Sequence, residues 1–468
     1  MDAIHAGFPG NVLKSHGRNY SVILFVRLKK PTEDVGGECL RKHFVNWMES
    51  PGFSITYHQD QLVQKEQKDK SGDYKLSFIT MGISRRGFNW LKVQQNLIPK
   101  DRIEKYFENP MLELTIGGDF WSYSGGDVED NSNDGEITGQ KKFKLDKNFE
   151  IRSGGIHLAF LIANDDREQM YRSLQKICTA TGFNECVDSY FLEFGEKGEN
   201  GAGPLGFKDN ISNEDKASRI FEMTNVSGHE SLRSNSGSIG TFMVYQKIRV
   251  DNESFESLVS QIKNKIVFPD GTEKRFGYTK RQHAEAYLIG RFKDGRPLVL
   301  ADNGDNYEKQ DFNYYQNNFT YSRKSKCPVA AHVRAANPRN RKSVLSQDQH
   351  AGIIRRGVNF EYLSIGKIPN VSGLHFISYQ SSVSELAIIM KRMRRLASGG
   401  PDAAFYRLST KRDKARFPIT WGESGEFEIP LNGEDVSQLL GGEIFFMPSR
   451  EYFEEILSLL QFQEVDIA

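Results

Sequence analysis

The sequence has few cysteines and no long apolar run, and each scarcity narrows the classes of protein to consider. Its 468 residues contain four cysteines, and no two of them form a C-x-x-C pair. A structural zinc knuckle is therefore not expected, and so sparse a set of cysteines is typical of a reducing compartment. No segment approaches the roughly 18 to 20 consecutive apolar residues of a membrane-spanning helix.

Neither a targeting segment nor a strong overall charge is visible. The opening residues, MDAIHAGFPGNVLKSHGR, lack the apolar core of a signal peptide and a pair of adjacent arginines, so we expect a cytoplasmic protein, or one exported by a route that the sequence does not show. The formal net charge is +1, so no overall field draws the chain to nucleic acid or to a membrane surface. We therefore expect neither of these as a partner.

Two stretches of the chain look alike and indicate an internal duplication. GIHLAFLIANDDREQMYRSLQKI starts at Gly155, GLHFISYQSSVSELAIIMKRM starts at Gly373, and each reads as a strand followed by a helix. The same 218-residue offset carries the strand-like run 22–28 onto another, 240–246. Further helical patterns begin at Gly37 and Asn252, and Asp165 and Asn252 resemble helix N-caps.

This alternation of strands and helices predicts an α+β fold, with antiparallel sheets covered by helices. The polar run 224–238, TNVSGHESLRSNSGS, is rich in Ser, Asn and Gly and favours a boundary there. We therefore expect an N-terminal domain over residues 1–225 and a C-terminal domain over residues 226–468.

A basic segment of the C-terminal half contains a histidine between two prolines. Residues 327–356 carry six Lys or Arg side chains and one acid, Asp348. A solvated charged face is one interpretation. A nucleic-acid surface would need interleaved aromatic residues for base stacking, and the segment has none. A compact anion with carboxylates or phosphates is the third interpretation.

His332, in CPVAAHVRAANPR, is the candidate metal ligand of this segment. Pro328 and Pro338 limit the residues between them to a short helix or turn. A lone histidine is more often structural than a ligand, but the neighbouring alanines are small, so a bulky group could approach closely. A neutral imidazole can bind iron through one nitrogen when an acceptor fixes the other.

Two further segments offer an acid and a cation. In GAGPLGFKDNISNED, residues 201–215, Asp209 lies in a glycine-rich loop, where it could simply stabilise a turn. In GIIRRGVNF, Arg355 and Arg356 follow two isoleucines, and a buried guanidinium needs an anion. With an iron-ligating histidine, an acid and an arginine would form a peroxide site: the acid moves a proton between the oxygens, and the arginine stabilises the anion.

Together these segments resemble the dye-decolorizing peroxidases, a family of haem enzymes. CPVAAHVRAANPR resembles the haem-ligand motif C-P-x-x-A-H-x-R-x-x-N-P-R of that family, and GFKDN resembles its G-x-x-D-G motif. IIRRGVNF, GLHFISYQSS, GFPGNVLKSHGR and HAEAYLIGRFKDGRPLVL are similar to other shared stretches. The resemblance runs in order from residue 8 to residue 385 and points to the longer-chain subgroup.

The resemblance implies a duplicated ferredoxin-like fold (a dimeric α+β barrel) and one non-covalent haem b per chain. His332 would be the proximal iron ligand, Asp209 the distal acid–base residue, and Arg355 the distal arginine, with Arg356 as the second choice. The other residues expected at the cofactor are Arg339, which would pair with a propionate, the pocket-lining Leu374 and Phe376, and also Arg334, Phe207 and Glu385.

Two departures from the family pattern concern the surroundings of this site. Asn210 replaces the last glycine of G-x-x-D-G, and asparagine is the residue other than glycine that best tolerates positive φ. The acid that should orient His332 has no clear match, because the segment after GLHFISYQ begins with two serines. Glu385 is the acid that we predict for this role.

The implied activity is reduction of hydrogen peroxide coupled to one-electron oxidation of phenols, dyes or other bulky aromatic reductants. A homo-oligomer is compatible with this activity. The alternative is a haem-binding module for storage or sensing without physiological peroxidase turnover. That alternative needs His332 and Arg339 but makes no demand on Asp209.

Overall fold

The computed structural model describes most of the chain. The described residues are 3–33, 35–94, 97–100, 155–208, 217–227, 237–268, 277–301, 326–336, 352–362, 371–394, 402–405, 414–421, 425–431 and 436–462. Across these ranges, no helix combines the length and the apolar character needed to span a membrane.

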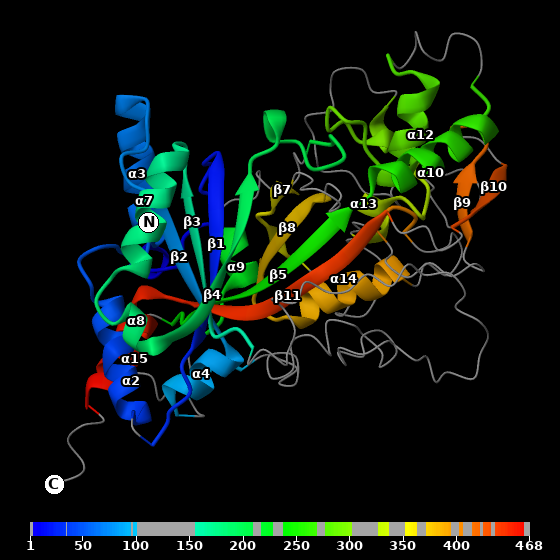
Figure 1. Ribbon diagram of the computed structural model, residues 1–468. Helices are drawn as coiled ribbons and strands as arrows, with labels where there is room; N and C mark the ends of the chain where they lie inside the picture. The colour runs from blue at the N-terminus through cyan, green and yellow to red at the C-terminus, as the bar shows by residue number, and fades with distance from the viewer. Residues whose placement is uncertain are drawn as a thin grey trace, which may run out of the picture.

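A nine-stranded antiparallel sheet forms the centre of the molecule (Figure 1). The strands follow the order β5-β11-β2-β3-β1-β4-β7-β8-β6. Because β5 also pairs with β8, the strands from β5 to β8 in this order form a closed ring. The strands are β1 Tyr20–Leu28, β2 Phe78–Ser84, β3 Leu158–Asn164, β4 Val187–Glu196, β5 Gly240–Val250, β6 Ile354–Arg355, β7 Val358–Tyr362, β8 Val371–Gln380 and β11 Ser437–Pro448.

Helices pack around this sheet, and a small lobe extends from one end of it. The lobe contains the two-stranded sheet of β9 Lys414–Pro418 and β10 Glu426–Pro430, beside α10 and α12 (Figure 1). The helices are α1 Ala3–Ala6, α2 Gly37–Met48, α3 His58–Ser71, α4 Arg85–Leu91, α7 Arg167–Cys178, α8 Phe183–Cys186, α9 Ala217–Thr224, α10 Asn252–Lys265, α12 Lys280–Ile289, α13 His332–Ala336, α14 Ser384–Arg394 and α15 Arg450–Phe462.

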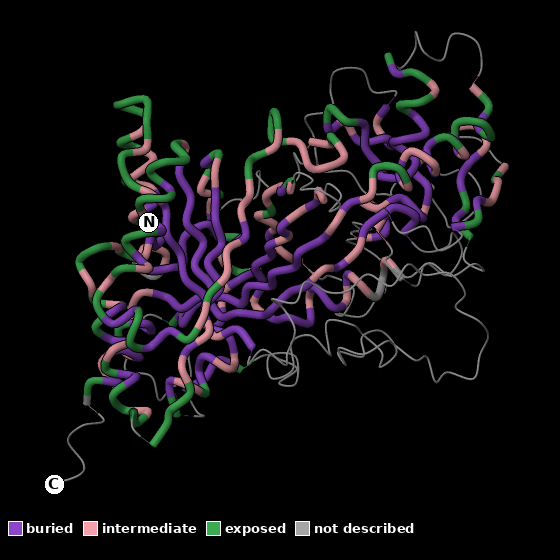
Figure 2. Tube along the Cα trace, in the orientation of Figure 1, coloured by how far each residue is buried: buried purple, intermediate pink, exposed green. Residues whose placement is uncertain are grey.

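The strands are buried on both faces because their side chains alternate between two apolar clusters. On β1, Val22 and Leu24 belong to the cluster beneath the helices, whereas Ile23 and Phe25 belong to the cluster enclosed by the strands. We call these the outer face and the inner face of the sheet. Figure 2 shows the resulting core as a continuous buried band along the strands.

The structure confirms the predicted mixture of antiparallel strands and helices. The runs 22–28 and 240–246 lie in β1 and β5, and the two stretches that look alike form β3 with α7 and β8 with α14. Residues 228–236, most of the predicted domain boundary, lie outside the described residues.

The predicted N-caps are each wrong by one residue. Asp166, not Asp165, caps α7, accepting hydrogen bonds from the backbone N–H groups of Glu168 and Gln169. Asp251, not Asn252, caps α10, accepting one from Ser254 at 3.0 Å. Asp166 directly follows Asp165, and Asp251 directly precedes Asn252. Each of these two caps has the extended backbone that an N-cap requires.

Replacing Asp251 by alanine is therefore expected to lower the free energy of unfolding by about 1 kcal/mol, because the first turn of α10 loses its side-chain acceptor. Urea denaturation measures the change. Asn252→Ala is the matched control, since Asn252 is already the first helical residue. A larger loss in the control than in Asp251→Ala would contradict the assignment of the cap.

Candidate functional site

A histidine–carboxylate pair is the central feature of the candidate site. His332 begins α13, and its Nδ1 lies 2.7 Å from Oδ2 of Asp402. The carboxylate is completely buried, whereas 23% of the His332 side chain remains accessible. Because a carboxylate accepts, the Nδ1 of a neutral His332 carries the proton and its Nε2 keeps a free lone pair. An imidazole fixed in this way is suited to bind a metal through Nε2.

Asp402, rather than Glu385, is the acid that orients His332. Its second oxygen, Oδ1, accepts hydrogen bonds from the backbone N–H groups of Ala404 and Phe405, each at 3.0 Å. Glu385 lies in the first turn of α14, and its Oε2 accepts a hydrogen bond from the backbone N–H of Gly352 at 3.1 Å. The prediction that Glu385 orients His332 is therefore wrong.

Sequence reasoning missed Asp402 because it lies 70 residues from His332. The only local indication was PDAAF, in which an aspartate precedes small residues and can cap its own turn. That pattern is common in loops. Only the folded chain shows that the remaining carboxylate oxygen meets the imidazole.

The alanines around His332 serve protein packing. Ala330, Ala331 and Ala335 are each at most 1% accessible. A side chain at Gly290, after α12, would lie 3.5 Å from Ala331 and from the sulfur of Cys327. The expectation that these three alanines leave room for a bulky ligand is wrong, because they are already buried against protein, Ala330 and Ala331 beside α12 and the glycine that follows it.

Arg334 stabilises the turn of its own motif. Its side chain is buried, and its Nη1 donates a hydrogen bond to the carbonyl oxygen of Cys327. This contact ties the start of the motif to α13. A contact of Arg334 with a cofactor stays a prediction.

The two adjacent arginines point to opposite faces of the sheet. Arg355 pairs with Ser378, and Ile354 pairs with Tyr379. Ile354 and Tyr379 belong to the inner cluster, so Arg355 and Ser378 lie on the outer face. Arg356 reaches the segment that precedes β1, which we call the N-terminal segment. There it donates hydrogen bonds to the carbonyl oxygens of Asn11 and Val12. Arg355 is therefore the arginine that points to the outer face.

Leu374 and Phe376 share this outer face of β8. They alternate with His375 and Ile377, which face inward. Both are only half-buried, which fits the prediction that they line a pocket. Ser378 lies further along the same face and is completely buried, and within the described part of the chain its hydroxyl has no hydrogen-bond partner. Such an unsatisfied hydroxyl is expected where a polar ligand or water normally binds.

The remaining predicted residues are only partly visible. Phe207 packs edge-on against Phe255 of α10, with ring centroids 6.1 Å apart, at the border of the small lobe. Asp209, Asn210 and Arg339 lie outside the described residues, so their predicted roles remain predictions.

Helix α14 connects the histidine side of the site to the arginine side. Glu385, in its first turn, holds Gly352 just before β6, and the carbonyl oxygen of Met393, near its end, accepts from the N–H of Asp402 at 2.9 Å. These anchor points are eight residues apart, which is about 12 Å along a helix. The donor set fits a large planar iron cofactor such as haem: an imidazole at one end, an arginine at the other and half-buried apolar side chains on β8.

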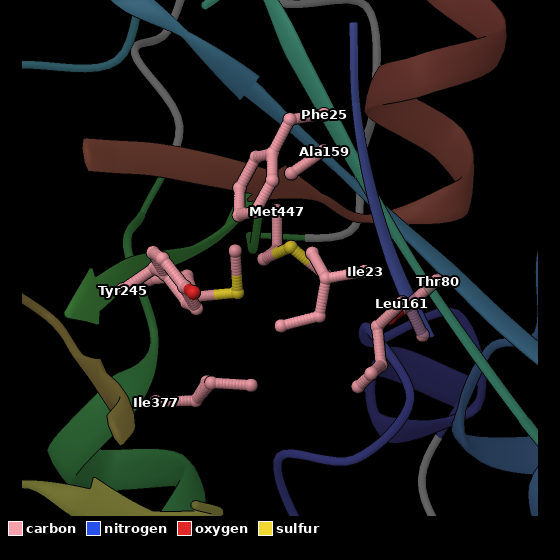
Figure 3. Close-up of a pocket in the computed structure, with 9 residues that line it drawn as sticks. Ile23, Phe25, Thr80, Ala159, Leu161, Tyr245, Ile377 and Met447 are labelled. Atoms are coloured by element: carbon pink, nitrogen blue, oxygen red, sulfur yellow. The ribbon is translucent and has the colours of Figure 1, made fainter. Parts of the chain in front are cut away.

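The small cavity inside the sheet is not this site. Figure 3 shows Phe25, Tyr245, Ile377 and Met447 converging on it from different strands. These side chains are almost all apolar and belong to the inner face, whereas Arg355 and Phe376 belong to the outer one. The nearby His375 accepts a hydrogen bond from Tyr245 at 2.9 Å, and burial lowers its pKa to about 3.

Several solved structures share this fold. The chain superposes on the DyP-type peroxidase from Anabaena sp. with a TM-score of 0.72, at 20% identity, covering 97% of this chain and 94% of that one. A dye-decolorizing peroxidase from Pleurotus ostreatus gives a TM-score of 0.68 at 17% identity, covering 98% and 99%. At such identities the likeness establishes the fold.

Sequence comparison points to the same family. Residues 203–417 match the family model described as "Dyp-type peroxidase, C-terminal". Peroxidase 2 of Mycetinis scorodonius is 24% identical over 263 residues, or 49% of either chain, and a dye-decolorizing peroxidase of the same fungus is 25% identical over 256 residues, covering 47% of this chain and 46% of that one. The alignments thus span about half the length of these relatives. The resemblance to DyP-type peroxidases that the motifs predicted is confirmed.

Proposed function

We propose that this protein is a haem b peroxidase that reduces hydrogen peroxide and oxidises phenols, dyes or other bulky aromatic compounds by single electrons. The observation that carries the proposal is the His332–Asp402 pair, which presents an imidazole nitrogen inside a sequence segment matched by the DyP-type family model. The half-buried apolar side chains of β8 and the outward Arg355 support it.

His332 would hold the iron of one non-covalent haem through Nε2, and Arg339 would pair with a propionate. The haem would supply the iron centre at which the O–O bond of peroxide is cleaved. Asp209 would take the proton from one peroxide oxygen and return it to the leaving oxygen. Arg355 would donate hydrogen bonds to the negative charge that develops as the bond breaks. Asp402 would keep the Nδ1 proton of His332 in place throughout.

The finer description of the architecture is also a proposal. The strand orders β4-β1-β3-β2 and β11-β5-β8-β7 repeat one pattern in the two halves of the chain, which supports a pair of ferredoxin-like units that close into a barrel. We propose units over 1–225 and 226–468, in a cytoplasmic protein that has small molecules rather than nucleic acid or membrane as partners and that can form a homo-oligomer.

A spectroscopic titration tests the proposed function. The protein should take up one equivalent of haem and show a Soret band, and His332→Ala should abolish that band. Turnover of a dye with peroxide separates an enzyme from a storage or sensing module, which would bind haem equally well but oxidise no dye. Failure to bind haem would overturn the proposal.

Arg355→Ala is expected to slow the reaction with peroxide about 10- to 100-fold, because the variant loses one hydrogen bond to a charged oxygen. Stopped-flow absorbance under pseudo-first-order conditions measures this rate. Arg416→Ala, on the surface strand β9, is the arginine control and should react like the parent protein. An unchanged rate in Arg355→Ala and in Asp209→Ala would sink the catalytic assignment.

A further inference from the structure

The arginine proposed to act on peroxide lies on the shortest strand of the sheet. β6 contains only Ile354 and Arg355, and among the described residues it pairs with β8 through two residue pairs. The backbone N–H of Arg356 adds one hydrogen bond to the carbonyl oxygen of Ile377 in β8, at 2.8 Å. Two pairs define the register of a strand weakly, and a shift of one residue would turn every side chain to the opposite face. Other contacts must therefore hold Arg355 on the outer face.

The neighbouring Arg356 makes such contacts. Its Nε donates to the carbonyl oxygen of Asn11 and its Nη2 to that of Val12, both at 3.0 Å. Its Nη1 donates to the carbonyl oxygen of Arg355 itself at 3.1 Å. The planar guanidinium, with five donors in a fixed arrangement, thus ties the backbone of Arg355 to two consecutive peptides of the N-terminal segment.

The N-terminal segment is itself a firm anchor. Asn11 has a left-handed backbone, with φ of 68°, and it is completely buried. Its backbone N–H donates to Gln61 at 2.9 Å, and its Nδ2 donates to the hydroxyl of Tyr379 at 3.1 Å. Tyr379 is the residue of β8 that pairs with Ile354. The N-terminal segment, β8 and β6 are therefore each linked to the other two by hydrogen bonds.

We propose that Arg356, held by the carbonyl oxygens of Asn11 and Val12, is a positioning residue that fixes the orientation of Arg355. This inference rests on the proposed function, because it assigns Arg356 a task in the same peroxide site. Arg356 lies on the inner side and does not itself touch the reacting oxygens. The N-terminal segment is more than 300 residues away in sequence. By holding Arg356, it contributes indirectly to the stabilisation of an anion by Arg355.

Fluoride binding to the haem-loaded protein is the direct test, because a bound anion reports the donors around it without any turnover. Sodium fluoride titration followed by absorbance should give about 10- to 100-fold weaker binding in Arg355→Ala. Arg356→Gln should weaken fluoride several-fold and slow the peroxide reaction by a similar factor, with unchanged haem affinity. Arg356→Lys should recover part of the loss, because it restores the charge but not the planar set of donors.

A milder variant and a matched control distinguish a specific effect on Arg355 from a general loss of stability. Tyr379→Phe removes only the hydroxyl that holds Asn11, so it should shift fluoride affinity in the same direction by a smaller factor. Arg450→Gln cuts the ion pair of Arg450 with Asp60 in α3, 2.7 Å long, beside the N-terminal segment but away from β6. It should leave fluoride affinity unchanged. Amide hydrogen exchange of residues 352–358 should accelerate in Arg356→Gln and not in Arg450→Gln.

The outcomes separate this inference from the proposed function. If Arg355→Ala weakens fluoride binding but Arg356→Gln and Tyr379→Phe do not, the positioning role is overturned and the peroxidase proposal stands. If Arg355→Ala changes neither fluoride binding nor the peroxide rate, the catalytic role of Arg355 fails, and the positioning role fails with it. If Arg450→Gln matches Arg356→Gln in fluoride affinity, the effect is general loosening and the inference is overturned.

Discussion

Asp402→Asn is expected to weaken haem binding about 10- to 100-fold while leaving the fold intact, because the change reverses the hydrogen bond that sets the tautomer of His332. The asparagine oxygen can still accept from the backbone N–H groups of Ala404 and Phe405, which Oδ1 of Asp402 serves now. The amide nitrogen then faces Nδ1 of His332 and donates to it. The imidazole proton moves to Nε2, which removes the lone pair that iron needs.

Asp402→Ala should differ from Asp402→Asn in stability. The alanine leaves the two backbone N–H groups and the His332 Nδ1–H without their buried acceptor, at about 1 to 3 kcal/mol for each unsatisfied group. We expect a loss of about 3 kcal/mol or more in the free energy of unfolding of Asp402→Ala, and less than half of that in Asp402→Asn. Urea denaturation measures the stability, and Soret titration measures the haem affinity.

Glu385→Gln is the matched control for both variants. Its oxygen can still accept from Gly352, and Nδ1 of His332 already has Asp402 as its partner. Haem affinity should therefore stay at the parent value. If Glu385→Gln weakened haem binding as strongly as Asp402→Asn, the assignment of the orienting acid would be reversed.

The stability of the protein should fall steeply below pH 6.5, because several histidines are buried in the neutral form. Burial lowers the pKa of His58, His157 and His283 to about 4. It lowers the pKa of His16 and His375 to about 3. Unfolding returns each of these groups to its ordinary pKa near 6.5.

The sign of the effect follows from proton binding. Between about pH 4 and 6.5 the unfolded chain binds more protons than the folded chain, so acid favours unfolding. Each such histidine costs about 2 kcal/mol at pH 5 relative to pH 8. Glu443 acts in the opposite direction, because burial raises its pKa to about 7, and the folded chain then binds the extra proton. The histidines outnumber it, so we expect a net loss of at least about 4 kcal/mol, a large part of the stability of an ordinary domain.

Thermal unfolding recorded from pH 8 to pH 4.5 tests this expectation. The midpoint temperature should fall continuously below pH 6.5. His283→Gln removes one of the titrating groups, so its stability should depend less on pH, by at most about 1.4 kcal/mol per pH unit. A midpoint temperature that is flat from pH 7 to pH 5 would show that these histidines are not buried and neutral.

The sequence predicted several of the strands and helices, because these depend on local patterns. Alternating apolar residues identified β1 and β5, and helical spacing identified α7, α10 and α14. The errors occurred where a neighbouring residue could satisfy the same pattern. Asp165 and Asp166 both suit an N-cap, and only the backbone conformation selects the second.

The choice between the two arginines shows what the tertiary structure adds. Arg355 and Arg356 are chemically equivalent in the sequence, and either could serve a pocket. The pairing of β6 with β8 turns one of them outward, and the N-terminal segment binds the other. A partner that lies more than 300 residues away has no local pattern from which it could be found.

The sequence by itself determined the candidate ligand, His332, and the family that it resembles, because a motif is a property of consecutive residues. It also indicated β8 and α14, two of the elements that carry the site, because apolar periodicity is local. Only the tertiary structure decided that Asp402 and not Glu385 meets the imidazole, and that Ala330 and Ala331 pack beside α12. The reason is the same in both cases: hydrogen bonds and close packing depend on distances between residues that the chain brings together only when it folds.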